Sequence, residues 1–151
     1  MPDKARSKRI VAALVMAMQL PFVPQAAFAG TILVQTVDLS EMDMSSEGGE
    51  AKLFRLTNSG LGRCKIEAVH YGEMGRTTYR FIFDSELRYA AMREYAYAQP
   101  IATSPNVRMT LRREVLLASS EGAQSLPGEF SAYKGYFESR NLVQCAGGRR
   151  R

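Results

Sequence analysis

A chain of 151 residues, 46% of them apolar, can build one domain around its own core, which excludes a wholly disordered protein. Its formal net charge of +5 is concentrated at the two ends. Without residues 1–29 and the three terminal arginines, 13 basic residues remain against 14 acidic ones, a net charge of −1. Nucleic-acid binding therefore has little electrostatic support.

Residues 1–29 have the pattern of a secretory signal peptide. A basic start precedes an apolar run from Ile10 to Leu20, and Ala27-Phe28-Ala29 forms a small-x-small cleavage site. The run is shorter than the ~20 residues that span a membrane. We expect cleavage after Ala29, a periplasmic or secreted bacterial protein, and no stable membrane insertion once the signal is removed.

The next segment carries two strand patterns separated by a polar loop. Thr31–Leu39 and Ala51–Thr57 are the candidate strands, the first of them rich in Ile, Val and Thr. Ser40–Glu50 between them is acidic and contains glycines, which is typical of an exposed loop. Asn58-Ser59-Gly60 then predicts a turn.

The clearest local signal is a β-hairpin. Cys64–Tyr71 and Arg76–Phe83 flank a short loop, 72–75, that is bounded by glycines. Because side chains alternate between the two faces of a strand, folding about this loop predicts two sets of facing pairs. The mostly apolar face holds His70–Thr77, Ala68–Tyr79, Ile66–Phe81 and Cys64–Phe83. The charged face holds Tyr71–Arg76, Val69–Thr78, Glu67–Arg80 and Lys65–Ile82.

Residues 86–98 allow two interpretations. A turn at Asp84-Ser85-Glu86 followed by a strand would continue the sheet, whereas four alanines and a possible cap at Asp84 or Ser85 favour a helix. We favour the strand, because it extends the apolar face and because tyrosines suit strands. The pairs expected for that strand are Phe83–Leu87, Phe81–Tyr89, Tyr79–Ala91 and Arg76–Glu94.

The chain after Pro100 is predicted as loops and short strands. Val107–Leu117 alternates apolar and polar residues, as a strand with one wet face does. Glu129–Phe137 is ambiguous, since its aromatic residues have helical spacing but it contains a glycine. The remaining expectations are a loop at Ile101–Asn106, a polar loop at Ala118–Gly128, a closing strand at Leu142–Cys145 with Val143 and Cys145 on one face, and a basic disordered tail at 147–151.

An internal echo suggests repeated hairpins. Phe83 to Leu87 and Phe137 to Leu142 are both aromatic–turn–Leu units, and Tyr71-Gly72-Glu73 leads into the first of them. In these motifs the chain resembles uncharacterised small secreted bacterial proteins with aromatic strand–turn–Leu hairpins and a short closing strand. The resemblance covers roughly the second half of the chain and brings no known activity.

Cys64 and Cys145 are the only cysteines and His70 is the only histidine. In an oxidising compartment the two cysteines are expected to form a disulfide. No metal site or cofactor is expected, because a metal site needs more ligands of this kind. A hydrolase using His70 and Glu73 is the least favoured function, because no nucleophile motif accompanies the histidine.

We therefore expect a mainly β protein: a small antiparallel meander sheet or partly open barrel, with one disulfide and room for one short helix. Residues 30–146 form this domain. It is expected to be non-enzymatic and to bind an envelope protein or polymer, in an inhibitor-like way, through a sheet face or edge. The alternative is a carrier of a small apolar ligand. Tyrosine and arginine are common in binding hot spots, and the candidate surface consists of Tyr71, Arg76, Arg80, Arg88, Arg93, Tyr95 and Tyr97.

Overall fold

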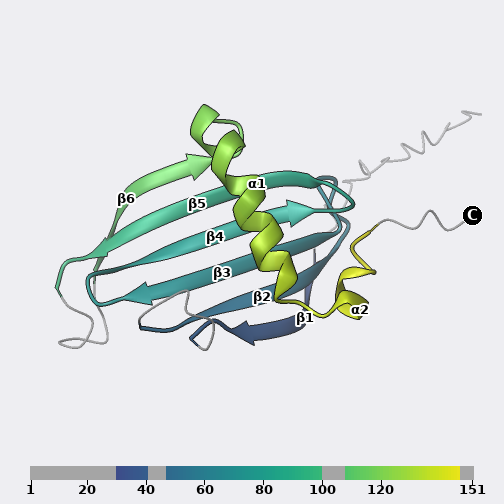
Figure 1. The fold of residues 1–151 in the computed structure, drawn as a ribbon, viewed down its shortest axis with the longest axis horizontal. Helices are drawn as coiled ribbons and strands as arrows, with labels where there is room; N and C mark the ends of the chain where they lie inside the picture. Colours follow the sequence, from purple (N-terminus) through teal and green to yellow (C-terminus); the bar gives the residue numbers. More distant parts are fainter. Residues whose placement is uncertain (1–29, 41–46, 100–107, 147–151) are drawn as a thin grey trace, which may run out of the picture.

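The computed structural model describes residues 30–40, 47–99 and 108–146. These residues form one open six-stranded antiparallel sheet whose strands neighbour one another in chain order, followed by two helices (Figure 1). The expected mainly β meander is confirmed. The elements are β1 (Gly30–Asp38), β2 (Gly49–Thr57), β3 (Cys64–Gly72), β4 (Gly75–Phe83), β5 (Leu87–Tyr97), β6 (Met109–Leu116), α1 (Ser120–Gly135) and α2 (Ser139–Leu142).

The β3–β4 hairpin has the register that the sequence predicts. Cys64 faces Phe83, Glu67 faces Arg80 and Tyr71 faces Arg76. The loop is closed by Gly72 opposite Gly75. A side chain at Gly75 would place its Cβ 2.2 Å from the carbonyl oxygen of Tyr95, so this glycine also lets β5 approach closely.

Residues 87–97 form strand β5, as favoured, but the expected register is wrong beyond its first pair. Phe83 does face Leu87, and then Arg88 is an extra residue, because Ile82 already faces Tyr89. A bulge of one residue exchanges the two faces of everything that follows. Arg76 consequently faces Tyr95, and Glu94 faces Thr77 instead of the expected arginine.

The polar loop expected at Ala118–Gly128 is wrong, since most of it belongs to helix α1. Ser119 caps this helix by accepting a hydrogen bond from the amide of Gly122 at 3.0 Å. Pro127 lies inside the helix and removes one backbone donor. Packing compensates for these weak local signals, because the helix buries an apolar stripe against the sheet.

That stripe continues through the ambiguous segment, Glu129–Phe137, which is helical up to Gly135. Its aromatic residues Phe130 and Tyr133 have the spacing of one helix face, and both contact side chains of β4. Phe130 lies 5.0 Å from Phe83, ring centre to ring centre, and Tyr133 lies 5.6 Å from Phe81. Rings of α1 therefore pack directly on the aromatic side chains of β4.

The expected closing strand at Leu142–Cys145 is also wrong. The chain there forms the end of α2 and a turn, so the segment from Phe137 to Leu142 does not repeat the hairpin seen at Phe83. Val143 is 69% exposed whereas Cys145 is 1% exposed, and the two do not share a buried face. Helical spacing separates the two side chains, because residues two apart do not face the same way on a helical turn.

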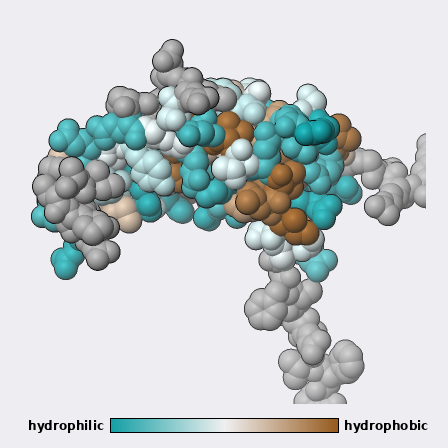
Figure 2. All heavy atoms as spheres, turned by 90° about the horizontal axis from the view of Figure 1, so that it is seen from below, coloured by the Kyte–Doolittle hydropathy of each residue, from teal (hydrophilic) through white to brown (hydrophobic). Residues whose placement is uncertain are grey.

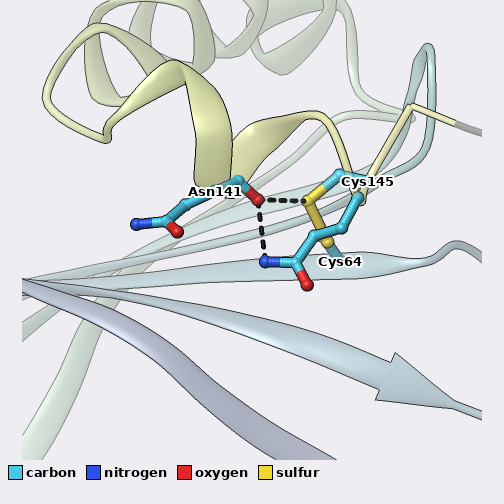
Figure 3. Close-up of a disulfide and its surroundings, with 4 residues drawn as sticks. Cys64, Asn141 and Cys145 are labelled. Carbon is cyan, nitrogen blue, oxygen red and sulfur yellow. Dashed lines mark hydrogen bonds between the residues drawn. A yellow bond between two sulfur atoms is a disulfide. The ribbon is translucent and has the colours of Figure 1, made fainter.

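The disulfide between Cys64 and Cys145 is confirmed, with the two Cα atoms 5.4 Å apart. It ties the turn after α2 to the first residue of β3 (Figure 3). Within that turn the carbonyl oxygen of Asn141 accepts a hydrogen bond from the Gln144 side chain at 2.9 Å. The disulfide therefore joins the sheet to the C-terminal helical segment, whereas the sequence predicted a closing strand there.

Both edge strands, β1 and β6, expose large apolar side chains. β1 exposes Ile32 and Leu33, at 45% and 53%. β6 exposes Met109 and Leu111, at 41% and 48%, so the apolar face expected for Val107–Leu117 is not buried along the first half of the strand.

Other predictions lie outside the described residues, namely the signal peptide at 1–29, most of the Ser40–Glu50 loop, the Ile101–Asn106 loop and the basic tail at 147–151.

Candidate functional site

The two faces of the sheet have different surroundings. Helix α1 crosses one of them (Figure 1), which we call the helix-covered face; it includes Phe81 and Val115, and His70, which contacts Tyr133 of α1. We call the other the open face, because neither described helix lies on it. Alternation along the paired strands gives its central residues as Lys65, Glu67, Val69, Tyr71, Arg76, Thr78, Arg80, Ile82, Tyr89, Ala91, Arg93 and Tyr95.

Five of the seven side chains proposed from the sequence meet on the open face. They come from three neighbouring strands: Tyr71 from β3, Arg76 and Arg80 from β4, and Arg93 and Tyr95 from β5. Tyr71 faces Arg76, which in turn faces Tyr95, so these three form one row across the sheet. The surface is therefore continuous.

Arg88 and Tyr97 lie elsewhere. Arg88 is the bulge residue beside the β4–β5 turn, where its Nε donates to both carboxylate oxygens of Asp84 at 3.2 and 3.1 Å. The amide of Glu86 and then Arg88 hold the pKa of Asp84 below its usual range. Tyr97 is only 8% exposed, so it offers little ring surface to a partner.

The centre of the open face is hollow because its middle residues are small. Val69 faces Thr78, and Ala91 lies in the next row opposite Arg80. Longer side chains stand around them and enclose a volume of about 250 Å³. The side chains around this hollow are those of Glu67, Arg76, Arg80, Arg93 and Tyr95.

Most charges on this face are paired. Glu67 accepts from Arg80 and lies 3.1 Å from Lys65 as well, which confirms the cross-strand pair predicted from the register. Arg93 pairs with Glu114 of β6 at 2.5 Å. Both pairs are partly exposed and contribute little to stability, on the order of 1 kcal/mol or less.

Arg76 differs from these arginines. Its guanidinium carbon lies 5.3 Å from the centre of the Tyr95 ring, a cation–π contact. Its Nε is buried and has no hydrogen-bond partner among the described residues. The bulge at Arg88 is the cause, because the uninterrupted register would have put Glu94 opposite Arg76. Glu94 instead lies 3.4 Å from Arg113.

His70 lies on the helix-covered face, away from the hollow. Its Nε2 hydrogen-bonds the hydroxyl of Tyr133 on α1, and its ring makes an edge contact with Tyr79 at 6.0 Å. Burial lowers the pKa of His70, while the charge of Glu129 partly opposes this shift. The histidine therefore joins α1 to the sheet.

Sequence reasoning missed the partners of His70 and the small residues of the hollow. Tyr133 belongs to an apolar stripe that begins at Leu126, and including Leu126 would have lengthened the helical pattern enough to predict α1. The sequence pattern that could have predicted the hollow is weaker than the one for α1. Val69 opposite Thr78 follows from the hairpin register, but the position of Ala91 depends on the bulge.

Within residues 30–40, 47–99 and 108–146, no cluster of three or more His, Cys, Asp or Glu side chains could hold a metal ion. In the same part of the chain, neither helix has the length and apolar character needed to cross a bilayer. Comparison with protein-family models, curated proteins and solved structures finds no match to this chain.

Proposed function

We propose that this protein is a non-enzymatic binding domain that uses the open face of its sheet to hold an envelope protein or polymer. The observation that carries the proposal is the gathering of Arg76, Arg80, Arg93 and Tyr95 around a hollow on a face that neither described helix covers, with Tyr71 opposite Arg76 on the same face. Tyrosine and arginine combine apolar contact area with hydrogen-bond donors, which is why they dominate binding hot spots.

The chemistry of the lone histidine supports the same proposal. His70 is engaged with Tyr133 on the opposite side of the sheet, so it is not directed at the hollow. His70→Ala is accordingly expected to leave binding by the open face intact in protein that remains folded. Export of the chain, which the pattern of residues 1–29 predicts, would bring the domain to envelope partners.

The β1 edge is a second candidate surface. Exposed Ile32 and Leu33 lie in a strand without a charged residue before Asp38, whereas β6 carries Arg112, Arg113 and Glu114. Charged edges resist the addition of a further strand, and uncharged edges permit it. Figure 2, seen from the side along which β1 lies, shows hydrophobic residues gathered on one part of a mainly hydrophilic surface.

Capture experiments distinguish the two surfaces. Mature protein is immobilised and exposed to envelope extract, and the retained partner is identified by mass spectrometry. We expect the partner to be retained by wild type and by Arg88→Ala, a control outside the open face, and lost from the double variant Arg80→Ala/Arg93→Ala. Retention by that variant in a folded state, with loss from Ile32→Lys/Leu33→Lys, would transfer the function to the edge.

A further inference from the structure

In the part of the chain that the structure describes, three arginines on or beside the open face donate a hydrogen bond from Nε to a carboxylate, whereas Arg76 does not. Arg80 donates its Nε to Glu67 at 3.1 Å, and Arg93 donates its Nε to Glu114 at 2.5 Å. Arg88, beside the turn, donates its Nε to Asp84. Only Arg76 of this set keeps a buried Nε without an acceptor among the described residues. Buried donors are normally satisfied, so this one indicates a missing acceptor.

We propose that Arg76 binds a carboxylate side chain from an acidic peptide segment of a partner protein. This inference rests on the proposed function and specifies the ligand of the open face. A carboxylate is planar and offers two acceptors, which match the fork of a guanidinium group. It would supply to Arg76 what Glu67 and Glu114 supply to the neighbouring arginines.

The surroundings of Arg76 favour this ligand. The Tyr95 ring holds the guanidinium group through a cation–π contact without neutralising it. Glu67 lines the same hollow, but its charge is offset by both Lys65 and Arg80. Among the described residues that line the hollow, an incoming acid therefore meets one cation without a carboxylate partner, Arg76. Because the Nε is shielded, the Arg76 side chain must rotate to reach the acid, a change that is common when proteins bind.

The shape of the hollow favours a peptide over an acidic polysaccharide. Its volume of about 250 Å³ accommodates one side chain, and the small residues Val69, Thr78 and Ala91 leave that space open. A chain of charged sugar rings would instead need a continuous groove with several free cations. Among the described residues, the other two arginines of the hollow, Arg80 and Arg93, and the neighbouring Lys65 are already paired with carboxylates.

Side-chain NMR of the mature protein tests the proposal directly. Each arginine gives an Nε–Hε signal, and that of Arg76 is assigned by its loss in Arg76→Lys. The probes are a capped peptide of alternating glycine and glutamate, the same peptide with glutamine, and an oligomer of uronic acid. We expect the glutamate peptide to shift the Arg76 signal more than those of Arg80 and Arg93, and the glutamine peptide to shift none of them.

Arg76→Lys keeps the charge and loses the fork, so it should weaken binding of the glutamate peptide at least about tenfold. Arg88→Lys is the matched control and should leave binding unchanged. Equal binding of the glutamine peptide, or an unmoved Arg76 signal in wild type, would overturn the carboxylate site. Tighter binding of the uronic acid oligomer would overturn the peptide assignment.

Failure of this inference can be told apart from failure of the proposed function. If the peptide, or the partner captured from envelope extract, shifts backbone signals of Tyr71 and Arg80 but leaves Arg76 unmoved, the open face binds and the carboxylate site is wrong. If the captured partner shifts no open-face signal at all, the proposed function itself is wrong. The wild-type titration remains informative even if Arg76→Lys does not fold.

Discussion

The two faces of the sheet are built from alternate residues of the same strands, yet they have opposite physical character. Phe81 is fully buried on the helix-covered face, and its neighbour Arg80 is exposed on the open face in a pair with Glu67. The helix-covered face is filled by rings from α1 and closed by a disulfide. The open face keeps its long polar side chains around a hollow. One face therefore stabilises the domain, and the other is the surface that we propose for binding.

The largest expected effect comes from emptying the helix-covered face. Phe81→Ala removes a ring that contacts both Phe130 and Tyr133, so it should lower the free energy of unfolding by about 3–5 kcal/mol. Arg80→Ala, one residue away on the open face, should cost less than about 1 kcal/mol. Urea denaturation of the two variants measures the difference. Equal losses would mean that the open face is as important for stability as the covered one.

The disulfide should have the next largest effect. Cys145→Ser should lower the free energy of unfolding by about 2–5 kcal/mol, because the bond closes a long loop, with the cysteines 81 positions apart. Hydrogen exchange should rise first in α2, while the β3–β4 hairpin stays protected. Adding a reductant to this variant should change nothing further. If exchange rose in α2 and in the hairpin at the same time, the disulfide would stabilise the whole sheet and not the C-terminal segment first.

A pH titration sharpens the comparison, because His70 is a contact of the covered face alone. Burial holds its pKa below the ordinary value of about 6.5, so the unfolded chain takes up a proton at higher pH than the folded chain does. Its contribution to stability is therefore complete above about pH 6.5 and is lost as the pH falls toward the folded pKa. His70→Gln should flatten this part of the curve. A wild-type curve that is already flat there would show that the burial of His70 is not maintained in solution.

The smallest expected effect concerns the open face. A double-mutant cycle on Glu67 and Arg80 should give a favourable coupling below about 1 kcal/mol, because the two side chains are 31% and 49% exposed. The coupling should shrink with added salt. A coupling of several kcal/mol would mean that the pair is shielded from water, and hence that something covers the open face in solution.

The candidate site could be predicted only in part. Tyr71, Arg76 and Arg80 follow from the hairpin alone, since its short glycine-bounded loop fixes which residues face one another. The unsatisfied Arg76 could not be predicted. The register predicted for residues 86–98 put Glu94 opposite Arg76. The bulge at Arg88 shifts the strand by one residue, so Tyr95 faces Arg76 instead. A bulge of one residue has no strong sequence pattern, because it depends on how several strands pack together.

The sequence by itself determined the elements whose signals are local. These are the first four strands, the hairpin register and the pairing of Cys64 with Cys145, which is expected from the presence of just two cysteines in a chain with the pattern of an export signal. Tertiary structure decided the C-terminal third. Helix α1 contains Gly122, Pro127 and Gly128, which weaken a helix considered alone. A Cβ at Gly122 would lie 2.0 Å from the carbonyl oxygen of Leu116, so the residue that disfavours the helix also permits its approach to the sheet. The helix forms because it buries Leu126 and Tyr133, and that free energy exists only once the sheet is present.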